Sequence, residues 1–325
     1  MSVKKINKLY ILFFVLFVSC SKRESITNYQ DIYIYTSDKD HNSIHDVVDN
    51  YLFDFSYYTP NPEKRYNSKS RTAVDFMNKP LHSLLMIISI EEFRDSTVDA
   101  IVKHLTSNSN DKISFVNDYY AKDQLLFILK YKDSQDLISG LSSNKEWILE
   151  KLKENDYKKL SKYSFRSGLN EELISTAEDM FGVNIKIQKD YKKIKINDDE
   201  NFFWIGRGYP YRWILLYEDI QKYYQTPKLS WERLESKFNE ILDINIISYK
   251  TQFETSSFNN KTRKIYGVYG TKIDSENPTG GPFLSYIIDQ PQSNKVLIAS
   301  GFVNFPGKNK VFHIKELEYI LETIK

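Results

Sequence analysis

Strand-like and helix-like patterns alternate along the first half of this sequence. Residues 31–36 combine β-branched and aromatic side chains and predict a strand. Apolar positions three and four apart then predict a helix over residues 44–55, capped by Ser43. Residues 81–90 are apolar without alternation, as expected for a strand buried on both faces. These patterns predict an α/β unit with a mixed sheet over residues 31–160.

The rest of that unit is predicted to contain a loop, two helices and two further strands. Residues 57–80 contain three prolines and many polar side chains, which predicts a long irregular loop. Apolar periodicity then predicts helices over residues 96–105 and 134–161, and strands over residues 113–117 and 124–131.

The second half, residues 161–325, has a different pattern, in which most predicted strands follow one another without an intervening helix. It opens with an amphipathic helix that Gly182 ends in the left-handed conformation, and Ser230 is expected to cap a later helix. The helices predicted here span residues 166–181, 230–242 and 310–324, and the strands span residues 183–188, 193–197, 202–206, 213–217, 246–255, 261–271, 282–290 and 294–304, with a tight turn at Asn259 and Asn260. We therefore expect a mostly antiparallel sheet with helices packed on one face, and an α+β chain as a whole.

The first twenty residues have the pattern of an export signal. Lysines at positions 4, 5 and 8 precede an apolar run over residues 9–18, which is too short for a bilayer core that needs about 20 helical residues. The run ends at Cys20, the only cysteine, and the last four residues resemble the lipobox of bacterial lipoproteins, with Phe17 where Leu is commoner. We expect residues 1–19 to be removed, Cys20 to be acylated, and residues 20–30 to form a tether. An ordinary signal peptide or a short anchor is the alternative.

This resemblance also implies a location. Several acyl chains on one cysteine anchor a protein stably in a lipid bilayer, whereas a single chain does not. In lipoproteins of this type, a serine after the cysteine, here Ser21, favours the outer membrane. Because no acidic run follows, we expect the folded part to face the periplasm rather than the cell surface.

Composition excludes several functions. Removing residues 1–19 leaves 42 basic and 43 acidic residues, so the mature chain lacks the basic excess of a nucleic-acid-binding protein. With Cys20 acylated, no disulfide, thiol nucleophile or cysteine metal site is available. We expect no cofactor.

Short motifs in both halves resemble a known family. They are the stretch from Gly182 to Tyr191, the stretch from Asp199 to Ile205, Tyr120–Gln124, Gly280–Phe283, and Gly301–Phe302 with Glu316–Glu318. This set is similar to the Bacteroidota lipoproteins grouped as domain of unknown function 4837, over nearly the whole mature chain. The resemblance implies an envelope lipoprotein. It brings no established activity and no catalytic residues.

Candidate catalytic and metal-binding motifs are weak. His41 and His45 stand four residues apart, but a zincin would need Glu where Asn42 stands, so a polar helix start explains them better than a metal site. The run from Asp198 to Glu200 contains adjacent acids, which do not by themselves span a glycosidase cleft.

A cluster of aromatic and arginine residues is the strongest candidate for a binding surface. Such side chains bind ligands through stacking and cation–π contacts, although a hairpin whose alternate residues fill the core explains the pattern as well. The cluster consists of Trp204, Arg207, Tyr209, Tyr211, Arg212 and Trp213. Separately, Asp95, Ser96 and Thr97 match a short O-glycosylation pattern, with Ser96 as the acceptor.

Two functions compete on these observations. The first is a non-catalytic envelope protein that binds a partner protein, glycan or lipid through the second half. The second is a hydrolase of envelope polymers, glycan or peptidoglycan, that uses carboxylates brought together by the fold. The lack of a catalytic constellation favours the first.

Overall fold

The computed structural model describes residues 22–39, 41–59, 61–106, 111–197, 199–247, 252–256, 262–271, 279–290 and 293–325. These residues form two compact units, and each is described by itself. The first unit comprises the described residues up to Asn28 together with Ile32–His45 and Lys69–Ser139, and the second comprises Tyr29–Asp31, Asp46–Ser68 and Gly140–Lys325. This division differs from the predicted linear boundary after residue 160, because residues 46–68 and most of the long central helix belong to the second unit.

The first unit is built on a five-stranded mixed sheet with the order β4-β1-β5-β7-β6. Strands β1, β5 and β7 run parallel, and β6 runs antiparallel to β7. The strands are β1 (Asp31–Thr36), β4 (Asn67–Thr72), β5 (Leu84–Ile90), β6 (Ile113–Asn117) and β7 (Leu125–Tyr131), and the helical elements are α2 (His41–Tyr51), α3 (Ala73–Met77), η1 (Glu91–Phe93) and α4 (Ser96–Leu105). The predicted mixed sheet is confirmed.

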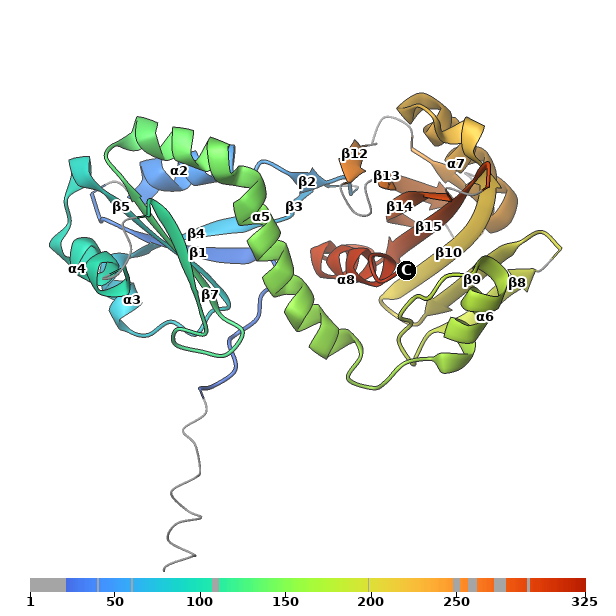
Figure 1. The fold of residues 1–325 in the computed structure, drawn as a ribbon, viewed down its shortest axis with the longest axis horizontal. Helices are drawn as coiled ribbons and strands as arrows, with labels where there is room; N and C mark the ends of the chain where they lie inside the picture. Colours follow the sequence, from blue (N-terminus) through green and yellow to red (C-terminus); the bar gives the residue numbers. More distant parts are fainter. Residues whose placement is uncertain are drawn as a thin grey trace, which may run out of the picture. The chain divides into compact units, whose positions relative to one another are not determined.

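The central strands are buried for the reason that their sequence indicates. Strands β5 and β7 are apolar at nearly every position, and almost all of their side chains are buried. Helices α3 and α4 pack on one face of the sheet through a shared apolar cluster that includes Phe76, Val98 and Leu126, and Figure 1 shows them together on one side of the strands. Asp95 starts α4 by accepting hydrogen bonds from the backbone N–H groups of the first turn.

The predicted irregular loop over residues 57–80 is wrong in part. It contains the hairpin of β2 (Ser56–Tyr57) and β3 (Glu63–Lys64), then β4 and α3. A capping box starts α3, in which Thr72 accepts from the N–H of Asp75 and the Asp75 carboxylate accepts from the N–H of Thr72. Helix α2 begins at His41, two residues before the predicted cap Ser43.

The second unit is built on an eight-stranded antiparallel sheet, in the order β11-β13-β14-β15-β10-β9-β8 with β12 paired to β13. Its strands are β8 (Lys192–Asn197), β9 (Phe202–Arg207), β10 (Tyr211–Ile220), β11 (Ile244–Ile246), β12 (Gln252–Ser256), β13 (Thr262–Thr271), β14 (Gly280–Gln290) and β15 (Lys295–Asn304). Its helices are α5 (Ser134–Ser164, from Gly140 on), α6 (Glu171–Phe181), η2 (Gln221–Tyr224), α7 (Pro227–Leu242) and α8 (Val311–Leu321). The antiparallel sheet and the α+β class are confirmed.

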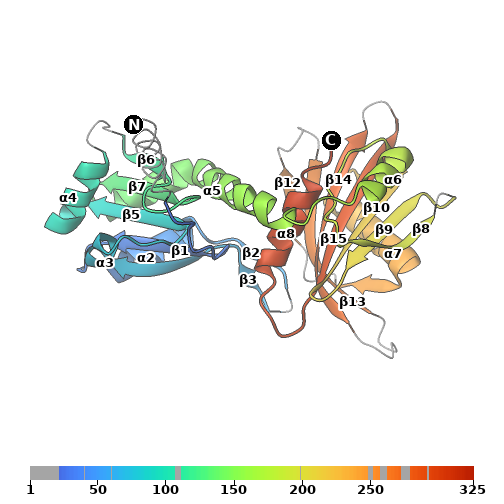
Figure 2. The ribbon, with the colours of Figure 1, turned by 90° about the horizontal axis from the view of Figure 1, so that it is seen from below.

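Helices cover both faces of this sheet rather than one. Alternate residues of the strands enter two separate cores, one shared with α6 and α8 and the other shared with α7. Figure 2 shows α8 and α7 on opposite sides of the strands. The prediction placed helices on one face only, but both sets of alternate positions along these strands are apolar, so both faces need cover.

Several local predictions are refined. Gly182 ends α6 with a φ of 66°, as its position after the helix predicts. Helix α7 is capped by Thr226 and continues through Pro227, so the predicted cap Ser230 lies buried inside the helix. The stretch 183–188 is not a strand, and Asn259 and Asn260 lie outside the described residues.

Helix α8 buries charged side chains in the core of the second unit. The ammonium group of Lys315 lies 2.9 Å from Asp156, and burial lowers the pKa of Lys315 to about 8. Burial alone would raise the pKa of Glu322, but Lys264 and Lys153 lower it to about 2. This polar core requires complete pairing, because an unpaired buried charge costs several kcal/mol.

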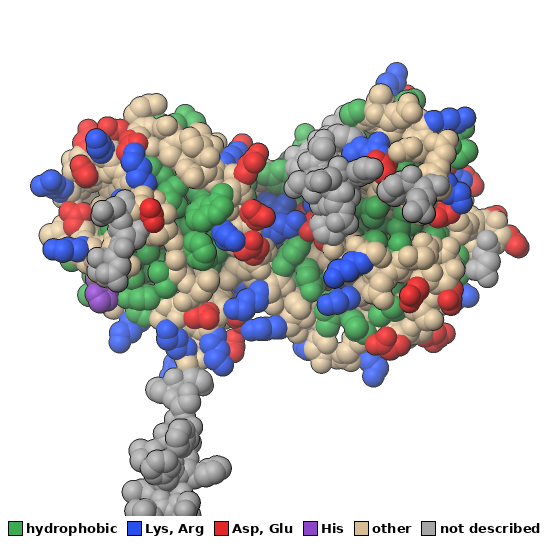
Figure 3. All heavy atoms as spheres, viewed as in Figure 1, with side chains coloured by type: hydrophobic (Ala, Val, Ile, Leu, Met, Phe, Trp, Pro, Cys, Tyr) green, Lys and Arg blue, Asp and Glu red, His purple; other side chains and the backbone are tan. Residues whose placement is uncertain are grey.

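Within the part of the chain that the structure describes, no helix is both long and apolar enough to cross a membrane. On the face shown in Figure 3, acidic and basic side chains are interspersed over each unit. The predicted signal peptide and Cys20 lie outside the described residues.

Candidate functional site

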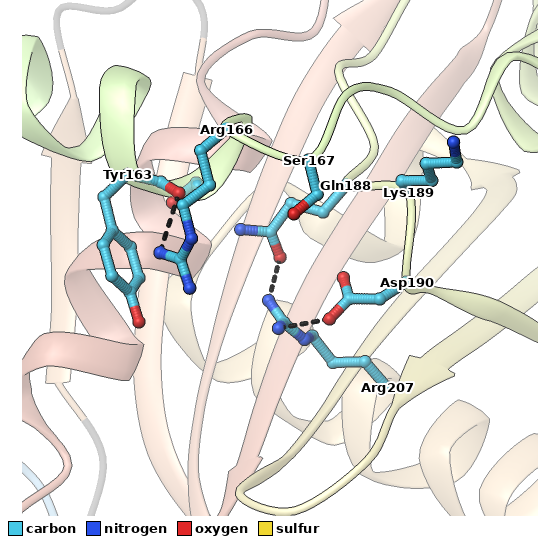
Figure 4. A pocket seen from close by; sticks show the side chains of 8 residues that line it. Tyr163, Arg166, Ser167, Gln188, Lys189, Asp190 and Arg207 are labelled. Atoms are coloured by element: carbon cyan, nitrogen blue, oxygen red, sulfur yellow. Dashed lines mark hydrogen bonds and ion pairs between the residues drawn. The ribbon is translucent and has the colours of Figure 1, made fainter.

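A polar pocket of about 310 Å³ lies in the second unit, where the end of α5, the connection from α5 to α6, the loop before β8 and the end of β9 come together. The α5 end and its connection contribute Tyr163, Ser164, Arg166 and Ser167. The loop contributes Gln188, Lys189 and Asp190, and β9 contributes its last residue, Arg207. In Figure 4 the side chains of Gln188 and Asp190 point toward Arg207, whereas Lys189 points away from it.

Arg207 is the hub of the pocket. Its guanidinium donates to the side-chain oxygen of Gln188 and forms an ion pair with Asp190, the two contacts drawn from it in Figure 4. A second acidic contact joins Nη1 of Arg207 to Oε1 of Glu316, at 3.8 Å. The guanidinium carbon also lies 5.8 Å from the centre of the Tyr191 ring. These contacts engage both terminal nitrogens of Arg207, so its guanidinium is held in place and supplies positive charge to the pocket.

A fully buried carboxylate supports the pocket from below. Glu316 of α8 has no exposed surface. It forms an ion pair with Arg212 and accepts hydrogen bonds from Ser164 Oγ at 3.0 Å and Gln188 Nε2 at 2.7 Å. Since a buried charge is tolerated only when it is paired and hydrogen-bonded, these contacts hold Gln188 and Ser164 in fixed positions. The wall of the pocket is therefore preorganised.

His313 stands behind this cluster, outside the pocket lining. Its Nδ1 lies 3.2 Å from Nη1 of Arg212, and because arginine only donates, Nδ1 is the acceptor and the proton sits on Nε2. Burial, and then the charge of Arg212, lower the pKa of His313 to about 4. The imidazole is therefore neutral at physiological pH.

Two exposed cations stand at the rim. The guanidinium of Arg166 lies 4.0 Å from the centre of the Tyr163 ring and donates to the Tyr163 carbonyl at 3.2 Å. Lys189 is exposed, and its backbone N–H bonds to the carbonyl of Gly168, which adopts a φ of 94° in the connection. With Arg207, the pocket has three cationic side chains and one acidic side chain, Asp190. Its formal excess is two positive charges, which favours an anionic ligand.

The structure divides the predicted aromatic and arginine cluster between two faces of the sheet. Arg207 and Arg212 point to the face covered by α6 and α8, where they meet Glu316. Trp204 and Trp213 point to the opposite face and pack against the α7 core. This split follows from strand alternation in the paired β9 and β10.

Tyr209 and Tyr211 lie at the turn between these strands. They are exposed by 62% and 46%, and their rings meet edge to face. The bond from Tyr209 to Pro210 is cis. The six predicted residues therefore do not form one surface. Arg207 alone lines the pocket, and Arg212 is buried and paired, as expected for a supporting residue.

The other predicted sites receive less support. Ser96 is exposed as the first residue of α4, a position accessible to modification, and its glycosylation stays a prediction. His45 lies in α2 and is half-buried, while the side chain of His41 lies outside the described residues. Among the described residues, no three histidine, aspartate, glutamate or cysteine side chains gather as metal ligands would. Acylation of Cys20 also stays a prediction.

Sequence reasoning missed the residues that complete the pocket. Ser164 comes from a segment without a motif, and Gln188 lies in the Gly182–Tyr191 stretch, which resembles a family but indicates no chemistry. Glu316 is more than 100 residues further along the chain from Arg207. The sequence contained one signal of this buried cluster. The last helix has too few polar positions to lie on the surface, yet it carries Lys315, Glu316 and Glu318 among its apolar residues. Charged residues in such a helix indicate a buried ionic network.

Comparison with known proteins gives a family match that covers part of this site. Residues 170–323 match the family described as "Domain of unknown function (DUF4837)". The match contains Gln188–Arg207 and the whole of α8, whereas Ser164 and Arg166 precede it. The match confirms the predicted resemblance to a domain of unknown function over residues 170–323, and the lipoprotein nature stays a prediction. A search of curated proteins gave no match.

Two solved structures show remote similarity. One is the Ran-binding protein Mog1p of Saccharomyces cerevisiae, with a TM-score of 0.33 and 10% identity, covering 45% of this chain and 91% of that chain. The other is a point mutant of Mog1, with a TM-score of 0.31 and 8% identity, covering 44% and 89%. Similarity at this level does not establish a shared fold.

Proposed function

We propose that this protein is a lipoprotein of the bacterial envelope, tethered to the outer membrane by acylated Cys20 and facing the periplasm. We further propose that its second unit binds an acidic saccharide without cleaving it. The N-terminal pattern supports the anchor and the location. The cationic pocket around Arg207 supports the ligand class, and it is the observation that carries the proposal. The family match adds no activity of its own.

The chemistry of the pocket favours a carboxylated sugar. Arg166 offers a planar fork of N–H donors at the rim, which matches the two oxygens of a carboxylate. Arg207 adds positive charge, because its Nη1 and Nη2 already contact Gln188 and Asp190. Ser167 and Gln188 offer neutral hydrogen-bonding groups of the kind that sugar hydroxyls use. A volume of about 310 Å³ is at the lower end of the range for ligand sites, which suits a single ring rather than a long chain in a deep cleft.

The same geometry argues against hydrolysis at this site. A glycosidase needs one acid that gives up a proton and a second that acts as base or nucleophile. Here Asp190 is paired with Arg207, and Glu316 is buried beneath the wall with Arg212 and two neutral donors. Carboxylates whose oxygens are already engaged by a fixed guanidinium are poorly placed to protonate a substrate oxygen. Binding is therefore the function that this arrangement serves.

Calorimetric titration of the full mature chain with glucuronate tests the ligand, with glucose as the neutral control. We expect glucuronate to bind, glucose not to bind, and affinity to fall with salt. The double variant Arg166→Gln with Lys189→Gln changes only exposed side chains, so it keeps the fold and lowers affinity at least tenfold.

A matched control changes two exposed lysines outside the pocket, Lys186→Gln with Lys193→Gln. It removes the same number of positive charges and should leave affinity within twofold of the wild type. Equal losses in both double variants would show non-specific attraction to charge and would refute the pocket as the site.

Metabolic labelling with a palmitate analogue tests the anchor. The wild-type chain should take up label and fractionate with the outer membrane, and Cys20→Ala should lose both properties. Unchanged labelling of Cys20→Ala would overturn the anchor and leave the ligand site to stand on its own.

A further inference from the structure

A second cavity lies in the first unit and has no part in the site above. Its volume is about 710 Å³, well within the range of small-molecule sites. It opens where β5 and β7 end, with Ser89 of β5 paired in register with Lys130 of β7. The carboxyl ends of parallel strands are the edge at which open α/β sheets place their ligands, because helices follow each strand and leave a crevice there.

The lining of this cavity is predominantly basic. Five cationic side chains face three acidic ones, so the formal excess is two positive charges. The cations are Arg94, Lys103, Lys112, Lys130 and Lys132, and the acids are Glu91, Asp99 and Asp136.

Two of the acids are already bound within the protein. Asp136, in the first turn of α5, accepts hydrogen bonds from the Lys112 ammonium group at 2.8 and 3.0 Å and from the backbone N–H of Lys132. These hydrogen bonds lower the pKa of Asp136. Asp99 accepts a hydrogen bond from Ser89 Oγ at 2.9 Å. Arg94, Lys103 and Lys132 are exposed at the mouth. The charge available to a ligand is therefore positive.

A buried donor without a partner provides the second, independent observation. Tyr131, the last residue of β7, lines the cavity, is only 3% exposed, and its hydroxyl makes no hydrogen bond within the described part of the chain. Burial, with a smaller contribution from Asp136, raises the pKa of Tyr131 to about 12, so the hydroxyl keeps its proton. A buried hydroxyl without a hydrogen-bond partner destabilises the free protein. A ligand oxygen that accepts this proton would remove this destabilisation.

We propose that this cavity binds a phosphate monoester, with Tyr131 donating to a phosphate oxygen and Lys103 and Lys132 balancing its charge. A monoester carries close to two negative charges at neutral pH, which matches the excess of two positive charges in the cavity. Lysines bind phosphate as mobile point charges, and Arg94 at the mouth adds a guanidinium whose donors match phosphate oxygens. A soluble metabolite and a lipid headgroup share this chemistry.

The test uses the full mature chain and two probes. Glycerol 3-phosphate, titrated by calorimetry, represents the soluble source. Phosphatidylcholine vesicles that contain phosphatidic acid, assayed by co-sedimentation, represent the lipid source. Binding of the first alone assigns a soluble ligand, and binding of the second alone assigns a membrane headgroup. Absence of binding to both overturns the proposal.

Tyr131→Phe is the diagnostic variant. Because the hydroxyl has no partner in the free protein, its removal should leave the unfolding midpoint unchanged or slightly raised, while affinity for the bound probe falls about tenfold. A variant that unfolds normally and binds as tightly as the wild type refutes the role of Tyr131 and, with it, the proposed site.

Charge variants separate this site from the one in the second unit. Lys103→Gln with Lys132→Gln should lower phosphate affinity at least tenfold, and Lys39→Gln, an exposed lysine of the same unit outside the cavity, should not. The Arg166→Gln and Lys189→Gln variant should bind glycerol 3-phosphate normally. If phosphate binding is lost only in that variant, the anion occupies the second-unit pocket and the proposal is wrong.

Discussion

The ion pair between Arg65 and Glu318 allows a sharp test of how the second unit is stabilised. Glu318 has no exposed surface and lies 2.9 Å from Nη2 of Arg65. It also accepts hydrogen bonds from the hydroxyl groups of Tyr57 at 3.1 Å and Tyr266 at 2.7 Å. Glu318→Leu leaves the Arg65 charge largely buried without its counter-ion, and both tyrosines lose this acceptor. We expect the free energy of unfolding to fall by about 3–5 kcal/mol.

A double-mutant cycle isolates the contribution of the pair. Arg65→Met alone leaves a buried carboxylate and should cost about 3 kcal/mol, whereas the double variant with Glu318→Leu removes both charges and should cost much less than the sum. We expect a coupling energy of at least about 2 kcal/mol. The exposed pair of Lys237 and Glu240, at 2.9 Å, is the control, and its coupling should not exceed about 0.5 kcal/mol.

Urea unfolding followed by tryptophan fluorescence is the suitable assay. All four tryptophans of the chain lie after residue 140, so their signal reports the second unit alone. If the costs of the Arg65 and Glu318 single variants add in the double variant, the two charges do not compensate each other. The assignment of a paired buried core would then be wrong.

Three further predictions address single residues. Folding lowers the pKa of His313 from 6.5 to about 4, so the unfolded chain takes up the proton at a higher pH than the folded chain does. The second unit should therefore lose up to about 3 kcal/mol of stability as the pH falls from 6.5 to 4. The variant His313→Gln should flatten this part of a curve of stability against pH. Gly281→Ala would place a Cβ against the carbonyl oxygen of Val303 on the neighbouring strand and should lower the stability by about 2 kcal/mol or more in the same urea assay. Gly208→Ala is the control: its Cβ would meet open space, and its stability should stay within about 0.5 kcal/mol of the wild type. Gln124→Leu removes three buried hydrogen bonds of 2.8–2.9 Å between this side chain and backbone groups, and it should accelerate amide hydrogen exchange in the first unit. An unchanged exchange pattern would contradict a structural role for Gln124.

Local patterns predicted most elements of the fold because their information lies in adjacent residues. Helix α4 and strand β6 have the predicted ends, and α6 ends at Gly182 as expected. The errors occur where a local signal competed with another. Ser230 resembles a cap, but Thr226 with a following proline is the stronger start signal, and the prolines of residues 57–80 concealed a short hairpin and the capping box at Thr72.

The two candidate sites were beyond local patterns for a different reason. The pocket around Arg207 is completed by Gln188 and by Ser164, and the residues that fix it lie on α8, whose contacts depend on how the chain crosses the sheet. Strand alternation separated Arg207 from Trp204, although the two residues are only three positions apart. A sequence shows which residues alternate but not which face a distant helix will cover.

The short motifs behind the family resemblance gain a physical meaning from the structure. Gly281 permits the close approach of two strands, and Gly301 lies where a Cβ would meet the side chain of Leu317 in α8 at 3.1 Å. Glu316 and Glu318 of that helix anchor two separate buried networks, one beneath the pocket and one around Arg65. These residues therefore act together, because a helix seated closely on the sheet is what allows its carboxylates to reach their partners. Any change that lifts α8 from the strands should weaken the pocket wall and the buried core at once, so that ligand affinity and stability of the second unit fall in parallel.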